Sequence, residues 1–79
     1  MKTQILSLQG VTYEGEATLL NAQTLSGEIT ILPEHQPIIS VLKEGSRIYL
    51  DDQEGRKTFE VASGFLHLDG NNTLTVLLH

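Results

Sequence analysis

Apolar and polar residues alternate with a period of two along most of the chain, and turn residues interrupt the alternation every few positions. Successive side chains of a β-strand point to opposite faces of a sheet, so this period predicts short strands that each bury one face. The one helical alternative, residues 38–43, is short and bounded by Pro37 and Gly45. The pattern therefore predicts an all-β sandwich or barrel of about eight short strands.

The expected strands are residues 3–8 with a continuation at 11–13, then 16–23, 28–32, 38–42, 47–50, 57–62, 65–68 and 73–78. Turn or bulge signals separate them at residues 9–10, 14–15, 26–27, 44–45, 63–64 and 69–72, and residues 51–56 read as a polar hairpin tip. The alternation places Leu6 with Leu8 on one face of the first strand, and Phe59 with Val61 on one face of a later strand.

Residues 33–37 form a stiff loop, because Pro33 and Pro37 fix their own φ angles and favour extended geometry in the residues before them. A rigid loop beside exposed aliphatic and charged side chains is typical of a docking surface, since little entropy is lost on binding. The alternative is that Ile29 and Ile31 belong to the core and the prolines only shape a corner. The residues alone leave both interpretations open.

The composition narrows the possible partners. Seventy-nine residues predict one domain, residues 1–79, and ten acidic against five basic residues give a formal charge of −5. This charge argues against binding to nucleic acid or to an anionic lipid surface. The chain has no cysteine, no signal-peptide pattern and no apolar stretch of membrane-spanning length. We therefore expect a soluble cytoplasmic protein.

The residues show no pattern for catalysis. His35, His67 and His79 have no spacing that relates them, so neither a metal site nor a cofactor is expected. The acidic residues 51, 52 and 54 stand beside two basic residues at a hairpin tip, which favours a solvated turn over a general acid–base pair. Ser63-Gly64 is interpreted as a bend where a side chain would clash.

Residues 27–37 read Gly-Glu-Ile-Thr-Ile-Leu-Pro-Glu-His-Gln-Pro. This segment resembles the pattern Gly-Glu-x-Gly-Ile-Leu-Pro-x-His-x-Pro of the F-type ATP synthase epsilon subunit, called delta in mitochondria. Residues 12–16, 43–45, 61–68 and 72–77 resemble further family motifs in the same order. Thr30 stands where the family has glycine. The family's carboxy-terminal helical hairpin has no counterpart in the chain, so the inhibition of ATP hydrolysis that the hairpin provides is not expected here.

The resemblance implies a flattened β-sandwich of roughly ten strands, so the expected range is about 8–10. It also implies a non-catalytic subunit of the central stalk, peripheral to the cytoplasmic face of the membrane and not inserted in it. Such a subunit docks the gamma subunit onto the c-ring and couples proton or sodium translocation to ATP synthesis. The family's c-ring contact falls on Glu28, Ile29, Thr30 and Ile31, and its gamma contact on His35 and Ser40.

Two alternatives remain at this stage. A free-standing interaction or carbohydrate-binding sandwich usually exposes an aromatic platform. The only aromatic residues are Tyr13, Tyr49, Phe59 and Phe65, of which the two phenylalanines look like core. A small metal-dependent enzyme would require His35 and His67 to converge.

Overall fold

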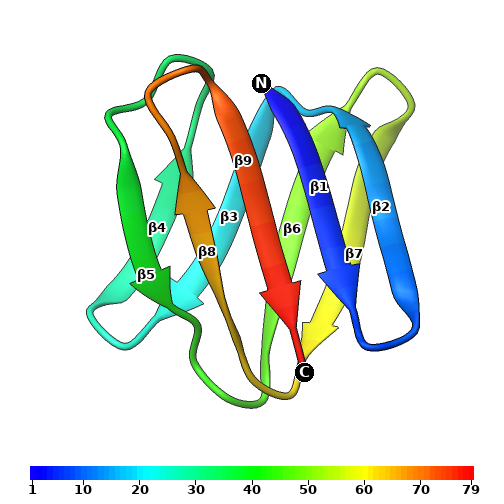
Figure 1. Cartoon of the computed structure of the whole chain (residues 1–79), viewed down its shortest axis with the longest axis vertical. Coiled ribbons are helices and arrows are strands. Elements are labelled where there is room, and N and C mark those ends of the chain that lie inside the picture. Colours follow the sequence, from blue (N-terminus) through cyan, green and yellow to red (C-terminus); the bar gives the residue numbers. More distant parts are fainter.

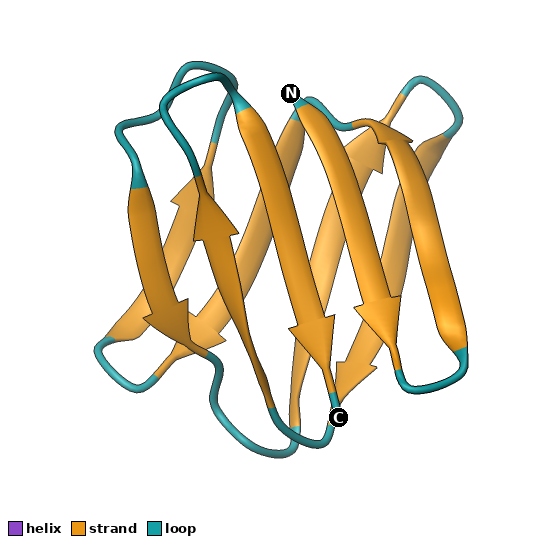
Figure 2. Ribbon diagram, viewed as in Figure 1, coloured by secondary structure: helices purple, strands orange, loops and turns teal.

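Nine β-strands and no helix make up the regular structure of the computed structural model, which describes all residues 1–79 (Figures 1 and 2). The strands are β1 (Lys2–Ser7), β2 (Gly10–Glu16), β3 (Leu19–Thr24), β4 (Gly27–Ile31), β5 (Ile38–Val41), β6 (Ser46–Asp52), β7 (Gly55–Val61), β8 (Gly64–Leu68) and β9 (Thr73–Leu78). The prediction of an all-β fold is confirmed, and nine strands fall within the expected range. No element is a helix with the length and apolar character needed to cross a membrane.

The strands form two sheets packed face to face (Figure 1). The five-stranded sheet has the order β2-β1-β9-β8-β5, and the four-stranded sheet has the order β4-β3-β6-β7. Neighbouring strands are antiparallel except for β1 and β9, which are parallel. The first and last strands of the chain therefore lie side by side in the middle of the five-stranded sheet.

The core lies between the inner faces of the two sheets. Buried and exposed side chains alternate along the strands. In β8, for example, Leu66 and Leu68 are fully buried, whereas Phe65 and His67 are exposed. Burial of one such aliphatic side chain contributes about 1.5–3 kcal/mol. The buried cluster consists of Met1, Ile5, Ala17, Leu20, Ala22, Ile31, Leu42, Ile48, Leu50, Val61, Leu66, Leu68, Leu74 and Val76.

The sandwich is joined along one side and open along the other. On the joined side, Thr24 pairs with Leu42 and the Leu25 N–H donates to the Val41 carbonyl oxygen at 3.1 Å. On the open side β2 and β7 make no ladder, and Tyr13 spans the gap. Its ring lies edge-on to the Phe59 ring, with centroids 6.0 Å apart.

The first third of the chain corrects three predictions. Gly15 does not interrupt a strand but pairs with Thr3 inside β2; the irregularity lies at Thr12, which the register skips. The expected strand 16–23 is two elements, because the chain crosses between the sheets at residues 17–18 and β3 begins only at Leu19. Leu8 lies in the β1–β2 turn, beyond the end of β1, and is 81% exposed. The buried residues of β1 are Thr3 and Ile5.

The bend at Ser63-Gly64 is confirmed. A Cβ atom added at Gly64 would collide with the backbone carbonyl oxygen of Leu77 on the neighbouring strand β9. The glycine therefore allows the chain to leave β7 and enter β8 at close backbone distance.

Candidate functional site

Strand β4 carries the segment expected to contact the c-ring, and its four residues point to opposite faces of the sheet. Ile31 pairs with Leu20 and is fully buried, so its side chain cannot touch a docked partner. Ile29 is half-buried and packs against the core. Glu28 and Thr30 are exposed. The alternation thus divides the expected contact into a displayed polar pair and two supporting aliphatic residues.

The displayed pair is held by one side chain of the adjacent strand β3. The amide of Asn21 donates to the Glu28 carboxylate and to the Thr30 hydroxyl, each at 3.0 Å. The three residues border a shallow hollow on the outer face of the four-stranded sheet, together with Tyr49 and Arg56. The Glu28 carboxylate makes no ion pair with any basic residue of the chain.

The loop that contains His35 is fixed by its neighbours. The His35 N–H donates to the Leu32 carbonyl at 3.1 Å, which closes a tight turn. Glu34 takes a φ of 66°, and its N–H donates to the Asn72 side chain at 2.8 Å. This bond ties the loop to the β8–β9 turn. The structure therefore supports the predicted stiffness of residues 33–37 with a contact that the sequence does not reveal.

The two residues expected to face gamma do not share a surface. His35 is half-buried in the loop, and its Nδ1 lies 2.7 Å from the Gln36 carbonyl oxygen. Ser40 lies within β5 opposite the buried Leu66, so its half-buried side chain is on the inner face of the sheet. Ile39, the residue before Ser40, has its side chain on the outer face and is 72% exposed.

The outer face of the five-stranded sheet carries a row of apolar side chains that the sequence analysis missed. The strand register places one residue from each strand in line. This apolar row consists of Val41, Phe65, Leu77, Leu6 and Val11. Val41 and Val11 at its ends are 53% and 59% exposed, and Phe65 is 39% exposed, so the expectation that Phe65 is core is wrong.

A signal for the apolar row does exist in the sequence. Apolar residues occur in adjacent pairs such as Ile5-Leu6, Phe65-Leu66 and Val76-Leu77. Since adjacent residues of a strand face opposite sides, each pair makes both faces of its strand apolar. A strand with two apolar faces needs cover on both, and this chain covers only one.

The outer face of the four-stranded sheet is charged instead. Arg56 forms a bidentate pair with Asp51 at 2.7 and 3.0 Å and lies 5.8 Å from the Tyr49 ring centroid. Arg47 pairs with Glu60 at 3.4 Å across β6 and β7. The two outer faces of the sandwich therefore differ in kind, one apolar and the other charged.

A second charged cluster lies at the β6–β7 turn. The Tyr13 hydroxyl donates to the Asp52 carboxylate at 2.8 Å, and Lys57 lies 3.3 Å from the same carboxylate. The bond from Tyr13 is the main cause that holds the pKa of Asp52 below its usual value. Burial, followed by this bond, raises the pKa of Tyr13 to about 12. The segment expected to be only a solvated turn thus contributes Asp52 to a hydrogen bond that links the two sheets.

The aromatic residues do not form a sugar-binding platform. Tyr13 and Phe59 pack on each other at the open side, Tyr49 lies beside Arg56, and Phe65 belongs to the apolar row on the opposite sheet. No group of three or more histidine, cysteine, aspartate or glutamate side chains is placed to hold a metal ion. The structure therefore has neither the aromatic platform of a carbohydrate-binding module nor the grouped side chains of a metal site.

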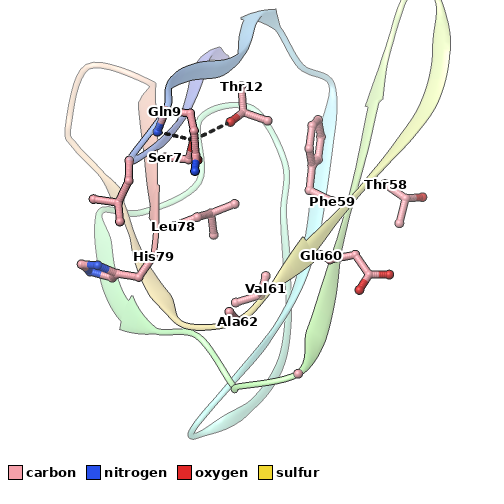
Figure 3. A pocket seen from close by; sticks show the side chains of 12 residues that line it. Ser7, Gln9, Thr12, Thr58, Phe59, Glu60, Val61, Ala62, Leu78 and His79 are labelled. Carbon is pink, nitrogen blue, oxygen red and sulfur yellow. Dashed lines mark hydrogen bonds between the residues drawn. The ribbon is translucent and has the colours of Figure 1, made fainter.

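The largest hollow, about 670 Å³, lies near the open side of the sandwich. In Figure 3 the side chains of Ser7, Gln9 and Thr12 lie on one side of it and those of Phe59 and Val61 on others. Its polar wall is satisfied internally, since the Ser7 hydroxyl bonds to the side chains of Gln9 and Thr12.

These features define the class of protein. A rigid β-sandwich with one apolar and one charged outer face is typical of a domain that docks other proteins. Residues 1–79 match the family described as the ATP synthase, Delta/Epsilon chain, beta-sandwich domain. The chain belongs to this family.

Individual relatives agree with the family. The ATP synthase epsilon chain of Rhodococcus erythropolis is 33% identical over 78 residues, which are 98% of this chain and 63% of that protein. The epsilon chain of Micrococcus luteus is 32% identical over 69 residues, 87% of this chain and 76% of that protein. The chain thus spans less than two thirds of the length of the Rhodococcus protein and somewhat more of the shorter Micrococcus one.

Solved structures show the same fold. A chain of the Euglena gracilis mitochondrial ATP synthase, solved as OSCP/F1/c-ring, superposes with a TM-score of 0.89 at 14% identity over 99% of this chain and 49% of that chain. A chain of the Tetrahymena thermophila mitochondrial ATP synthase central stalk and c-ring gives 0.81 at 14% identity, over 99% of this chain and 62% of that chain.

Proposed function

We propose that this protein is a non-catalytic subunit of the central stalk of a rotary F-type ATP synthase. It docks the gamma subunit onto the c-ring and couples ion translocation to ATP synthesis, as a peripheral part of the membrane complex. Its membership of the delta/epsilon family supports this function. The observation that carries the docking role is the apolar row, because an exposed apolar strip across a whole sheet is costly in water unless a partner covers it.

The two outer faces suit two different contacts. An apolar face excludes water from a permanent contact, and we assign it to gamma. The half-buried His35 lies in the loop that leads into β5, and Ser40 supports this strand from the inner face of the sheet. A charged face suits a contact that is fixed by electrostatic complementarity, and we assign it to the c-ring. The rigid core between the faces transmits torque from one contact to the other.

Within the proposed c-ring contact the four residues have different tasks. Glu28 and Thr30 meet the ring, while Ile31 and the half-buried Ile29 anchor β4 to the core. Because the Glu28 carboxylate has no basic partner within the chain, it is free to pair with a basic side chain in a loop of the ring. The hydrogen bond from Asn21 orients the carboxylate for that pairing.

A charge reversal tests this function. In the assembled complex we expect Glu28→Lys to lower the rate of ATP synthesis driven by the ion gradient about tenfold, since it replaces an attraction by a repulsion. Its matched control is Glu14→Lys, a reversal at another exposed acid with no ion pair, which we expect to leave the rate unchanged. The readouts are gradient-driven ATP synthesis in membrane vesicles and the melting temperature of each isolated variant.

Two outcomes would contradict different parts of the proposal. Normal coupling in the Glu28→Lys complex would remove Glu28 from the ring contact. Failure of the wild-type chain to co-purify with gamma and the c-ring would overturn the assignment to the central stalk.

A further inference from the structure

The four edge strands of the two sheets differ in how they are protected from pairing with another chain. Edge strand β2 contains the irregularity at Thr12 and two exposed acids, and β7 carries Arg56, Lys57 and Glu60. Edge strand β4 carries Glu28. Bulges and charged side chains are the usual means by which proteins keep an edge strand from pairing.

Strand β5 has none of these protections. Its sequence is Ile-Ile-Ser-Val, and its register against β8 is regular. Ile39 and Val41 display aliphatic side chains that are 72% and 53% exposed on the outer face. Both are β-branched residues, which pack well against a neighbouring strand. This is the one uncharged edge of the sandwich, and it continues directly into the apolar row.

The backbone of β5 also presents unpaired groups. The Leu42 N–H donates to the Gly64 carbonyl oxygen at 2.9 Å. This bond fixes which residues of β5 point their backbone groups toward β8, since such residues alternate along an antiparallel strand. By this alternation Ser40 bonds toward β8, and the N–H and C=O of Ile39 and the N–H of Val41 point away from it. The Val41 carbonyl is already occupied by the Leu25 N–H. Three backbone groups in a row therefore remain open to an incoming strand.

We propose that β5 receives an extended aliphatic strand of the gamma subunit, which enlarges the five-stranded sheet by one strand. This inference rests on the proposed function and names the structural element by which gamma binds. Main-chain hydrogen bonds to Ile39 and Val41 supply the register, and aliphatic side chains at alternate positions pack on the same two residues. The exposed acids Glu34 and Glu44 flank β5, so the incoming strand carries basic residues at its ends.

Charge distinguishes this occupant from a second copy of the chain. Pairing β5 with itself would bring together two molecules that each carry a formal charge of −5. Their mutual repulsion opposes a homodimer, whereas a basic partner gains attraction from the same charges.

Amide hydrogen exchange of the purified chain, with and without purified gamma subunit, tests the proposal. We expect the exchange of the Ile39 and Val41 amides to slow at least tenfold when gamma binds, because new hydrogen bonds protect them. The reference amide is Glu54, which is hydrogen-bonded within the β6–β7 turn of the other sheet, away from β5, and should not change. Sedimentation of the chain alone reports self-association.

The outcomes separate this inference from the proposed function. Binding of gamma with unchanged exchange at Ile39 and Val41 overturns the strand addition and leaves the stalk function intact. No binding of gamma at all overturns the stalk function and the inference with it. If the Ile39 and Val41 amides of the chain alone become more protected from exchange as the protein concentration rises, the occupant is a second copy. That result also overturns the inference.

A backbone variant gives an independent readout. Ile39→Pro removes the outward N–H and keeps the bonds to β8, so we expect gamma affinity to fall at least tenfold. Ile39→Val keeps the N–H and the β-branched shape, and its affinity should stay within about twofold of wild type. If Ile39→Pro does not fold, Ile39→Lys serves instead, since it places a charge on the edge without changing the backbone. Wild-type affinity in a folded variant of either kind contradicts the proposal.

Discussion

Tyr13 and Asp52 link the two sheets at the open side of the sandwich, where no backbone ladder does so. The hydroxyl of Tyr13 donates to the carboxylate, and the ring of Tyr13 packs against Phe59 on β7. An ionised carboxylate is the better acceptor, so the hydrogen bond favours the charged form of Asp52. The strength of the bridge across the open side therefore depends on whether Asp52 is ionised.

This dependence predicts the acid stability of the domain. The pKa of Asp52 is lower in the folded than in the unfolded protein, so its contribution to stability is present above the unfolded value of about 3.9 and is lost as pH falls through the folded value. The pKa of Asp51 is also lowered, chiefly by Arg56, and acts in the same window. We expect the free energy of unfolding to be constant from about pH 7 to 5 and to fall below about pH 4.

The Tyr13→Phe variant isolates the contribution of the bridge. It removes the main cause of the shift, so the pKa of Asp52, followed by NMR of the carboxyl group, should rise toward its usual value. Asp51 serves as an internal control, because its pairing with Arg56 is unaffected. An Asp52 pKa that stays unchanged in Tyr13→Phe would show that Tyr13 does not control this carboxylate.

At the scale of one element, β4 shows how a strand divides its residues between stability and contact. It is an edge strand whose inner face carries Ile29 and Ile31 and whose outer face carries Glu28 and Thr30. The motif that identifies the family therefore alternates inward-facing and exposed positions. The spacing of these residues follows from the period of two along the strand.

Adjacent substitutions in β4 separate these roles. We expect Ile31→Ala to lower the free energy of unfolding by about 2–5 kcal/mol, because it leaves a cavity in the core. Thr30→Ala, one residue earlier and exposed, should change the free energy of unfolding by no more than about 0.5 kcal/mol. Urea unfolding of both variants measures the difference. Equal stabilities would contradict the assignment of Ile31 to the core.

At the scale of the whole molecule, the sandwich consists of two stacked sheets (Figure 2), and the outer faces of these sheets differ in character. The apolar row crosses all five strands of one sheet, and ion pairs cover the other sheet. A small domain keeps such an apolar strip exposed only where binding covers it. In the proposed function, each of these two surfaces meets one partner.

A pair of lysine substitutions on the two faces tests this asymmetry. Phe65→Lys places a charge in the apolar row, and Thr58→Lys places one on the exposed outer face of β7. We expect Phe65→Lys to weaken gamma binding at least a hundredfold and Thr58→Lys to leave it within about threefold, with both variants folded by circular dichroism. Equal effects on binding would contradict the assignment of gamma to the apolar face.

The alternation of residues along the sequence determined the all-β class, the positions of most strands and the turns at residues 69–72 and 63–64. These features depend on local geometry: a period of two, a glycine that must fit against a backbone, and residues that favour turns. Local geometry also explains why the family motif at residues 27–37 is recognisable without a structure. Its prolines and glycine constrain the chain within that segment itself.

Only the tertiary structure decided which face of each strand is covered. Ile5-Leu6 and Phe65-Leu66 are apolar on both faces, so no local pattern tells which partner of each pair enters the core. That choice follows from the pairing of β1 with β9 and of β8 with β5, contacts between residues far apart in the chain. The same long-range pairing aligned the apolar row, left the edge of β5 open and turned Ser40 inward. The apolar row is a product of register, and register is fixed only when the strands meet.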